Sequence, residues 1–168
     1  MKKTIILALL LIVTGFGNAA FGQKAKFGHV DLTAVMQALP EWTTSQAELQ
    51  AKADELTKEG EALQSEFQKA YEDFQKKRGT YSDAVAKVKQ KEVEDMYKRL
   101  QAFQESAQSQ LTTKENELLE PIQKKALDAV KEVAKANGYT YVFDVSTQLY
   151  NSESDDLTDK VKEKLGVK

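Results

Sequence analysis

Few side chains in this sequence have the type and spacing that catalysis or metal binding requires. His29 is the only histidine, and it lies in an apolar segment typical of a strand, where a structural role is expected. Asp144, Asp155 and Asp156 suggest a cation site, but their spacing matches no calcium-binding loop, and Asp156 is better placed to cap a helix. There is no cysteine, nucleophile elbow, phosphate-binding loop or HExxH motif. We therefore expect no enzyme, no cofactor and no metal.

The first 22 residues have the composition of a secretory signal peptide. Two lysines precede an apolar run at residues 5–13, and small residues follow it. This run is shorter than the about 20 residues that a membrane-spanning helix needs, which favours cleavage over a retained anchor. We predict that residues 1–22 are removed and that the mature chain, residues 23–168, forms one domain in the periplasm. Export of a chain without disulfides fits the outside of the cell as well as the periplasm.

The net charge of the chain is small, and the charged residues are unevenly distributed along it. Removal of two lysines with the leader leaves 22 basic and 26 acidic residues, a net charge of −4. We therefore expect no nucleic-acid partner, because phosphate binding needs a basic surface. Residues 76–91 nevertheless have a net charge of +5. Their basic side chains, here called the basic tip, are Lys76, Lys77, Arg78, Lys87, Lys89 and Lys91. Two interpretations stay open: a solvated helix end, or a surface that attracts acidic segments or anionic lipid head groups.

The middle of the chain predicts a long antiparallel helical hairpin. In the first half, apolar and small residues recur three and four apart, a coiled-coil seam: Leu49, Ala53, Leu56, Gly60, Leu63, Phe67, Ala70 and Phe74. A second seam follows: Val93, Met96, Leu100, Phe103, Ala107, Leu111 and Leu118. Between them, Gly79 is expected to end the first helix in the left-handed conformation, and Ser82 to cap the second.

The two ends of the chain are expected to meet in one small body. The first helix should begin at a capping box, Thr43 with Gln46, and the second should break at Pro121. These limits give an arm of residues 43–120 and a body of residues 26–42 and 121–168. The body should contain strands near residues 26–31, 139–144 and 148–150. Short helices should follow Asp31 and Asp156, and Asn137-Gly138 should end the helix that follows Pro121. The predicted fold class is therefore α+β.

Aromatic residues gather in the distal half of the arm. Phe67, Phe74 and Phe103 lie on the seams, so packing between the two helices is the favoured interpretation. Four other residues are candidates for a surface that binds apolar segments: Tyr71, Tyr81, Met96 and Tyr97. Amphipathic rings and a flexible methionine suit the binding of many unrelated sequences.

Two local motifs lie at the two ends of the mature chain. The first motif is the segment 27–31 (FGHVD), with Val35 just after it. The second is the segment 133–139 (VAKANGY), followed by Val142-Phe143-Asp144, Tyr150 and the last helix, with Asp156, Leu157, Thr158, Val161 and Leu165. These motifs resemble the Skp/OmpH family of periplasmic chaperones, while the arm matches in character rather than in residues. Well-known members are strongly basic, so the mildly acidic mature chain departs from the family pattern.

The resemblance implies a homotrimer in which strands from three chains form a small barrel and three arms surround a cavity. It implies an ATP-independent holdase that binds unfolded outer-membrane proteins. A body of about 65 residues is marginal alone, which also favours an oligomer. The residues expected in the body or oligomer core are Phe27, Val30, Tyr139, Tyr141, Phe143 and Tyr150. The alternative functions are a coiled-coil spacer between envelope layers and a secreted adhesin.

Overall fold

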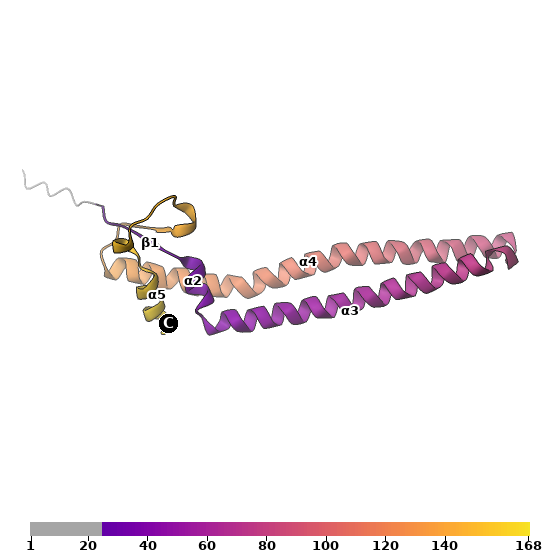
Figure 1. Cartoon of the computed structure of the whole chain (residues 1–168), viewed down its shortest axis with the longest axis horizontal. Coiled ribbons are helices and arrows are strands. Elements are labelled where there is room, and N and C mark those ends of the chain that lie inside the picture. The colour runs from indigo at the N-terminus through magenta and orange to yellow at the C-terminus, as the bar shows by residue number, and fades with distance from the viewer. Residues whose placement is uncertain (1–24) are drawn as a thin grey trace, which may run out of the picture.

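The protein consists of a small body and one long helical arm (Figure 1). The computed structural model describes residues 25–168, so the predicted signal peptide lies outside the described residues. The helices and strands are β1 (Phe27–Val30), α2 (Leu32–Gln37), α3 (Pro40–Lys77), α4 (Asp83–Ala136), β2 (Tyr141–Asp144) and α5 (Thr158–Leu165). Three short 3₁₀ helices, η1 (Arg78–Thr80), η2 (Val145–Thr147) and η3 (Glu153–Asp155), lie between them. The predicted α+β fold is confirmed. Among residues 25–168, no helix is both long and apolar enough to cross a membrane.

The arm is the antiparallel pair of α3 and α4, which lie side by side along its length (Figure 1). With 38 residues, α3 is roughly 57 Å long at 1.5 Å per residue. All residues of both predicted seams are buried or half-buried, and Leu56 and Leu100 are the most buried of them. The predicted hairpin is therefore confirmed. Its core is only one seam wide, because each helix buries a single stripe.

The first arm helix begins earlier than expected. It starts at Pro40, with Leu39 as the N-cap and no capping hydrogen bond from a side chain. Proline suits this position because its fixed φ is already helical and its missing N–H would have no partner in the first turn. The capping box predicted at Thr43 and Gln46 is therefore wrong.

The predicted break at Pro121 is also wrong. The helix α4 runs for 54 residues without interruption from Asp83 to Ala136. Pro121 lies on the exposed side, and the carbonyl of Glu117 that loses its usual donor belongs to an exposed residue that water can reach. On the opposite side, Ile122 and Ala126 are buried. Burial on both sides of the proline keeps the helix continuous, so the body and the arm share one helix.

The arm tip turns through η1 rather than through a left-handed glycine. Gly79 lies inside this 3₁₀ turn, and among the described glycines only Gly138 and Gly166 have positive φ, at 69° and 74°. The left-handed stop expected at Gly79 is therefore wrong. The predicted cap at Ser82 is confirmed, since its side chain accepts a hydrogen bond from the backbone N–H of Val85 at 3.5 Å. Gly138 follows the end of α4, as predicted.

The body joins the two ends of the chain through a parallel pair of strands. Phe27 pairs with Tyr141, and the register continues to Val30 and Asp144. The predicted pairing of distant segments is confirmed. The core beneath the sheet contains apolar residues from β1, α2, α4 and α5: Val30, Val35, Ala126, Ala129, Val130, Val133, Leu157 and Val161. Because four elements contribute to it, the body anchors the root of the arm.

The third strand expected at residues 148–150 does not form. The backbone N–H of Ser146 donates to the Asp144 carboxylate at 2.8 Å, and the Thr147 hydroxyl donates to the Asp144 carbonyl at 2.7 Å. These bonds wind the chain into η2 directly after β2. The chain therefore leaves the sheet before residue 148, and Leu149 and Tyr150 lie exposed.

The predicted cap at Asp31 is confirmed, but the one predicted at Asp156 is one residue too early, because Leu157 is the N-cap of α5. Asp31 accepts a hydrogen bond from the N–H of Ala34 at 2.8 Å, at the start of α2. Asp156 accepts one from the N–H of Thr158 at 2.8 Å, at the start of α5. Burial raises the pKa of Asp156, but hydrogen bonds from Thr158 and the nearby charges of His29 and Lys162 outweigh it. The net effect is a pKa below the ordinary value.

Candidate functional site

An aromatic patch lies on one side of the arm, and both helices contribute to it. The ring of Phe67 lies between Tyr71 and Tyr97, with centroid distances of 6.0 Å and 5.6 Å. The two tyrosines are 43% and 48% exposed. The Gln101 carboxamide donates to the Tyr97 hydroxyl at 3.1 Å and holds this ring in place. Three rings therefore offer apolar surface and two hydroxyl groups on a helix pair, and we call Phe67, Tyr71 and Tyr97 the aromatic patch.

The other two candidates in the arm lie elsewhere. Met96 is half-buried on the seam of α4, as its spacing implied. Tyr81 is half-buried at the tip, where it lines a small cavity of about 120 Å³ together with Phe74. Phe103 packs against Gly60: a Cβ at that glycine would lie 3.2 Å from the Cε1 atom of Phe103. These residues hold the helices together, and only Tyr71 and Tyr97 of the four candidates join the patch.

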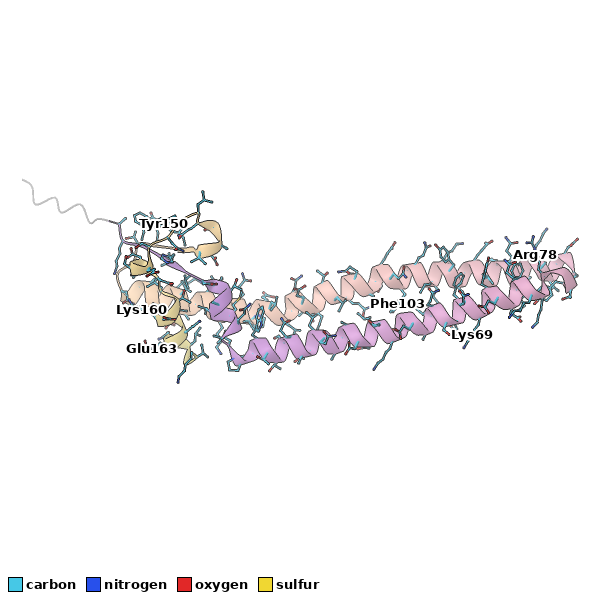
Figure 2. The ribbon with its side chains drawn as sticks, viewed as in Figure 1. Lys69, Arg78, Phe103, Tyr150, Lys160 and Glu163 are labelled. Carbon is cyan, nitrogen blue, oxygen red and sulfur yellow. The ribbon has the colours of Figure 1, made fainter. Side chains whose placement is uncertain are left out.

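Nearby acids partly neutralise the basic tip. All six of its side chains are exposed, and Figure 2 places Arg78 at the far end of the arm. Lys77 pairs with Asp73 at 2.7 Å, and this hydrogen bond raises the pKa of the lysine. Lys76 and Lys89 pair with acids one turn away, at 3.9 Å and 2.7 Å. Adding the three acids lowers the net charge from +5 over residues 76–91 to +2 over residues 72–92.

The sheet of the body exposes a second aromatic surface. Phe27, Tyr141 and Phe143 stack with centroid distances of 5.5, 6.3 and 6.4 Å. They are 53%, 55% and 44% exposed in the single chain. Alternation along a strand explains this, because Val30 and Val142 face the core from the other side. We call these three residues the sheet face.

The remaining residues predicted for the body core differ in their surroundings. Val30 is buried inside the chain. The ring of Tyr139 packs against the core, and the Lys26 ammonium lies 3.9 Å from its centroid. Tyr150 projects from the body (Figure 2) together with Leu149, which is fully exposed. The sequence interpretation missed Leu149. The signal was an apolar pair in a polar segment without strand or helix periodicity.

The titratable groups of the body give no sign of a catalytic or metal centre. His29 is buried in β1, and its backbone pairs with Asp156 through an isolated bridge. Within residues 25–168, no group of three or more His, Cys, Asp or Glu side chains could hold a metal ion. The described residues also present exposed rings, exposed charges and the surfaces of two helices to other molecules.

These features define a class of protein in which a small sheet body carries a long helical hairpin. The family described as outer membrane protein (OmpH-like) matches residues 26–165, and the chain belongs to this family, as the sequence motifs predicted. Proteins named chaperone protein Skp are similar over nearly the whole length. The one from Yersinia enterocolitica is 29% identical over 162 residues, covering 94% of this chain and 95% of the relative. The one from Vibrio cholerae is 26% identical over 166 residues, covering 96% and 95%.

A solved structure shares the fold. It is an OmpH-like outer membrane chaperone from Caulobacter crescentus, with a TM-score of 0.71 and 12% sequence identity. The likeness covers 84% of this chain and 83% of the other. The shared fold therefore includes much of the arm as well as the body.

Proposed function

We propose that this protein is a periplasmic chaperone that binds unfolded outer-membrane proteins and keeps them soluble without nucleotide. The observation that carries the proposal is the extent of the family match. Relatives named as chaperones align with 94–96% of the chain, so the similarity includes the arm. An arm whose core is one seam wide has most of its surface free for contacts. Residues 1–22 act as the export signal, and the mature chain carries out the binding.

The aromatic patch supplies the contact chemistry on the arm. Tyrosine rings bury apolar area against a client while their hydroxyl groups stay hydrated, so they bind many sequences without demanding one. Tyr71 and Tyr97 lie on the two neighbouring helices, and both rings pack against Phe67. We therefore place client contacts on this patch. The basic tip adds a weaker attraction for acidic client segments or anionic head groups, limited by its three local ion pairs.

The sheet face supports a homotrimer. Three large rings at about half exposure are unusual for a stable monomer, and the two-stranded sheet leaves strand edges open. Fully burying one such side chain contributes about 1.5–3 kcal/mol. Association of three sheet faces, with Tyr150 nearby, would supply the core that one small body lacks. Tyr141→Asp should then dissociate the protein, which light scattering detects. A stable monomer of the unmutated protein at micromolar concentration would contradict the trimer.

The shape of the chain favours this function over a structural spacer. The arm folds back, so α3 and α4 both return to the same body (Figure 1). A spacer that tethers two layers needs attachment at two separated ends. The hairpin instead presents a free tip and two long sides, which suits enclosure of a client between arms.

An aggregation assay tests the proposed function. An outer-membrane β-barrel protein unfolded in urea is diluted into buffer with the mature protein and without nucleotide. We expect suppression of light scattering that is unchanged by a metal chelator. Tyr71→Ser with Tyr97→Ser should weaken the suppression. Val88→Ser is the control, since it removes another exposed apolar side chain of the arm outside the patch. Aggregation at the same rate with and without excess protein would refute the proposal.

A further inference from the structure

The two sides of the arm differ in chemistry. One side carries the ion pairs that join α3 to α4: Glu41 with Lys125, Glu48 with Lys114 at 2.9 Å, and Glu66 with Arg99 at 3.9 Å. The three glutamates share one side because their separations, 7 and 18 residues, are close to two and five whole turns. The hydrogen bond from Lys125 lowers the pKa of Glu41, so this pair is ionised at neutral pH. We call this side the ion-paired flank.

The other side carries two open grooves between the helices. The grooves measure about 590 Å³ and 360 Å³. Six glutamines line them: Gln64, Gln68 and Gln104 the larger, and Gln46, Gln50 and Gln108 the smaller. Gln104 and Gln108 are one turn apart, so both grooves open on the same side of α4. On α3, Gln64 lies about 200° around the helix from Glu66, which places it on the side opposite the ion pairs. We call this side the glutamine flank.

Apolar residues of the seam form the floor of both grooves. Leu100 and Gly60 line the larger one, and Leu49, Ala53 and Leu111 line the smaller one. The aromatic patch continues the same side toward the tip, since Tyr71 follows Gln68 by three residues and Tyr97 precedes Gln101 by four. Three charged residues, Glu61, Lys69 and Glu115, also line the grooves and sum to −1. The flank is therefore an apolar strip bordered by carboxamides with little net charge.

This combination complements an extended polypeptide. A glutamine carboxamide both donates and accepts hydrogen bonds, as a backbone amide does, and it carries no charge that would select a sequence. An unfolded segment presents unpaired N–H and C=O groups together with apolar side chains. Gln50 and Gln68 donate to Asp54 and Glu72 at 2.9 Å, so these two offer the client backbone mainly their carbonyl oxygens. The other four carboxamides can both donate and accept, while the floor receives the side chains. The ion-paired flank also has a groove, of about 450 Å³, with Leu118 and Ile122 in its lining. The polar groups along that groove include Glu41, Glu48 and Lys125, which carry charge and already have partners across the helix pair. That flank therefore offers charged groups rather than neutral carboxamides to a client backbone.

We propose that the glutamine flank is the surface on which extended segments of an unfolded polypeptide bind. The backbone of the segment is hydrogen-bonded by the glutamines, and its apolar side chains lie over the seam and the aromatic patch. This inference rests on the proposed chaperone function and specifies which side of the arm performs it. It also explains how binding can be independent of client sequence.

Two neighbouring glutamines provide a matched test. Gln108 lies on the glutamine flank. Gln110 lies one turn before Lys114, hence on the ion-paired flank, where its carboxamide bonds to the Ser106 hydroxyl at 3.2 Å. Both are exposed and at the same depth along the arm. A photo-crosslinking amino acid is placed at each position in the mature protein, and a urea-unfolded outer-membrane β-barrel protein is added. We expect severalfold more client adduct from position 108.

The same samples are assayed for suppression of aggregation, which separates the two proposals. Suppression with equal adducts from both positions, or with more adduct from position 110, would overturn the flank assignment and leave the chaperone function standing. Adducts at position 108 with a second copy of the chain in place of the client would also overturn it. Absence of both suppression and client adducts would refute the chaperone function, and the flank assignment with it.

A second variant tests the role of the carboxamides by whether it lowers or raises the affinity for the client. Gln104→Leu with Gln108→Leu keeps the side-chain size but removes the hydrogen-bonding groups. If the carboxamides bind the client backbone, affinity should fall about tenfold, because each lost hydrogen bond contributes modestly. If apolar contact alone holds the client, affinity should rise, and this result would overturn the proposal. Gln110→Leu is the control and should leave affinity unchanged.

Discussion

Replacing Gly28 with alanine tests how the first strand is packed into the body. Gly28 is buried in β1, and a Cβ at this position would lie 2.8 Å from the Cδ1 and Cε1 atoms of Tyr139. It would also lie 3.3 Å from the carbonyl oxygen of Asp155. The ring cannot move away freely, because it packs against the core on one side and carries the Lys26 ammonium at 3.9 Å. The added methyl group therefore has to displace either the ring or β1.

The expected loss of stability in Gly28→Ala follows from this steric overlap. Overpacking of an ordered region costs about 1–3 kcal/mol. For a domain of this size, 1 kcal/mol shifts the melting temperature by about 2–4 °C, so Gly28→Ala should lower it by about 2–12 °C. The assay is thermal unfolding followed by circular dichroism, at one fixed protein concentration because an oligomer's melting temperature depends on it.

Gly79 provides the control. A Cβ there meets no atom within 4 Å, and its φ is not positive, so Gly79→Ala should be neutral or up to about 1 kcal/mol stabilising. The cost of Gly28→Ala should also shrink in a Tyr139→Leu background, where the opposing ring is gone. Equal melting temperatures for Gly28→Ala and Gly79→Ala would refute the packing of β1 described above.

Three further predictions concern the arm, the body and the tip. Gly60→Ala should gain up to about 1 kcal/mol of stability in a Phe103→Leu background, because helix propensity improves once the ring that lies 3.2 Å from the new Cβ is removed. Denaturant unfolding measures this, and a loss of stability would count against the Gly60–Phe103 contact. The lowered pKa of Asp156 contributes stability above its ordinary value of 3.8, and this contribution is lost as pH falls through the lower folded value. Asp156→Asn should therefore reduce the acid sensitivity of unfolding, and an unchanged pH profile would contradict the shift. Changing the six basic-tip residues to glutamine should slow client capture at low salt and leave oligomer stability unchanged, as stopped-flow fluorescence and light scattering measure. Identical capture rates for the variant and the unmutated protein would mean that the basic tip is only a solvated helix end.

Periodic patterns made the arm predictable from sequence. Leu56 and Leu100 are buried because each recurs with its neighbours at coiled-coil spacing, and such spacing is a property of one helix alone. The pairing of β1 with β2 was also predictable, since two short apolar strands in a small body need a partner. The turn at the tip followed from a break in periodicity and from a cap at Ser82.

Features set by tertiary contacts were not predictable. Pro121 looks like a break in sequence, but Ile122 and Ala126 bury the other side of the helix and keep it continuous. The strand predicted at residues 148–150 does not form, because Asp144 accepts hydrogen bonds from the two residues Ser146 and Thr147 that follow it closely in the chain. The two flanks of the arm depend on the register between α3 and α4, which brings glutamines of distant segments to the same grooves. Neither helix contains that information by itself.

We propose that the mature protein acts as a trimer that holds an unfolded client. Native mass spectrometry of the mature protein, mixed with an unfolded outer-membrane β-barrel protein in the absence of nucleotide, tests it most directly. We expect a complex of three chains with one client, and a trimer when no client is present. Monomers that form no complex with the client would contradict it.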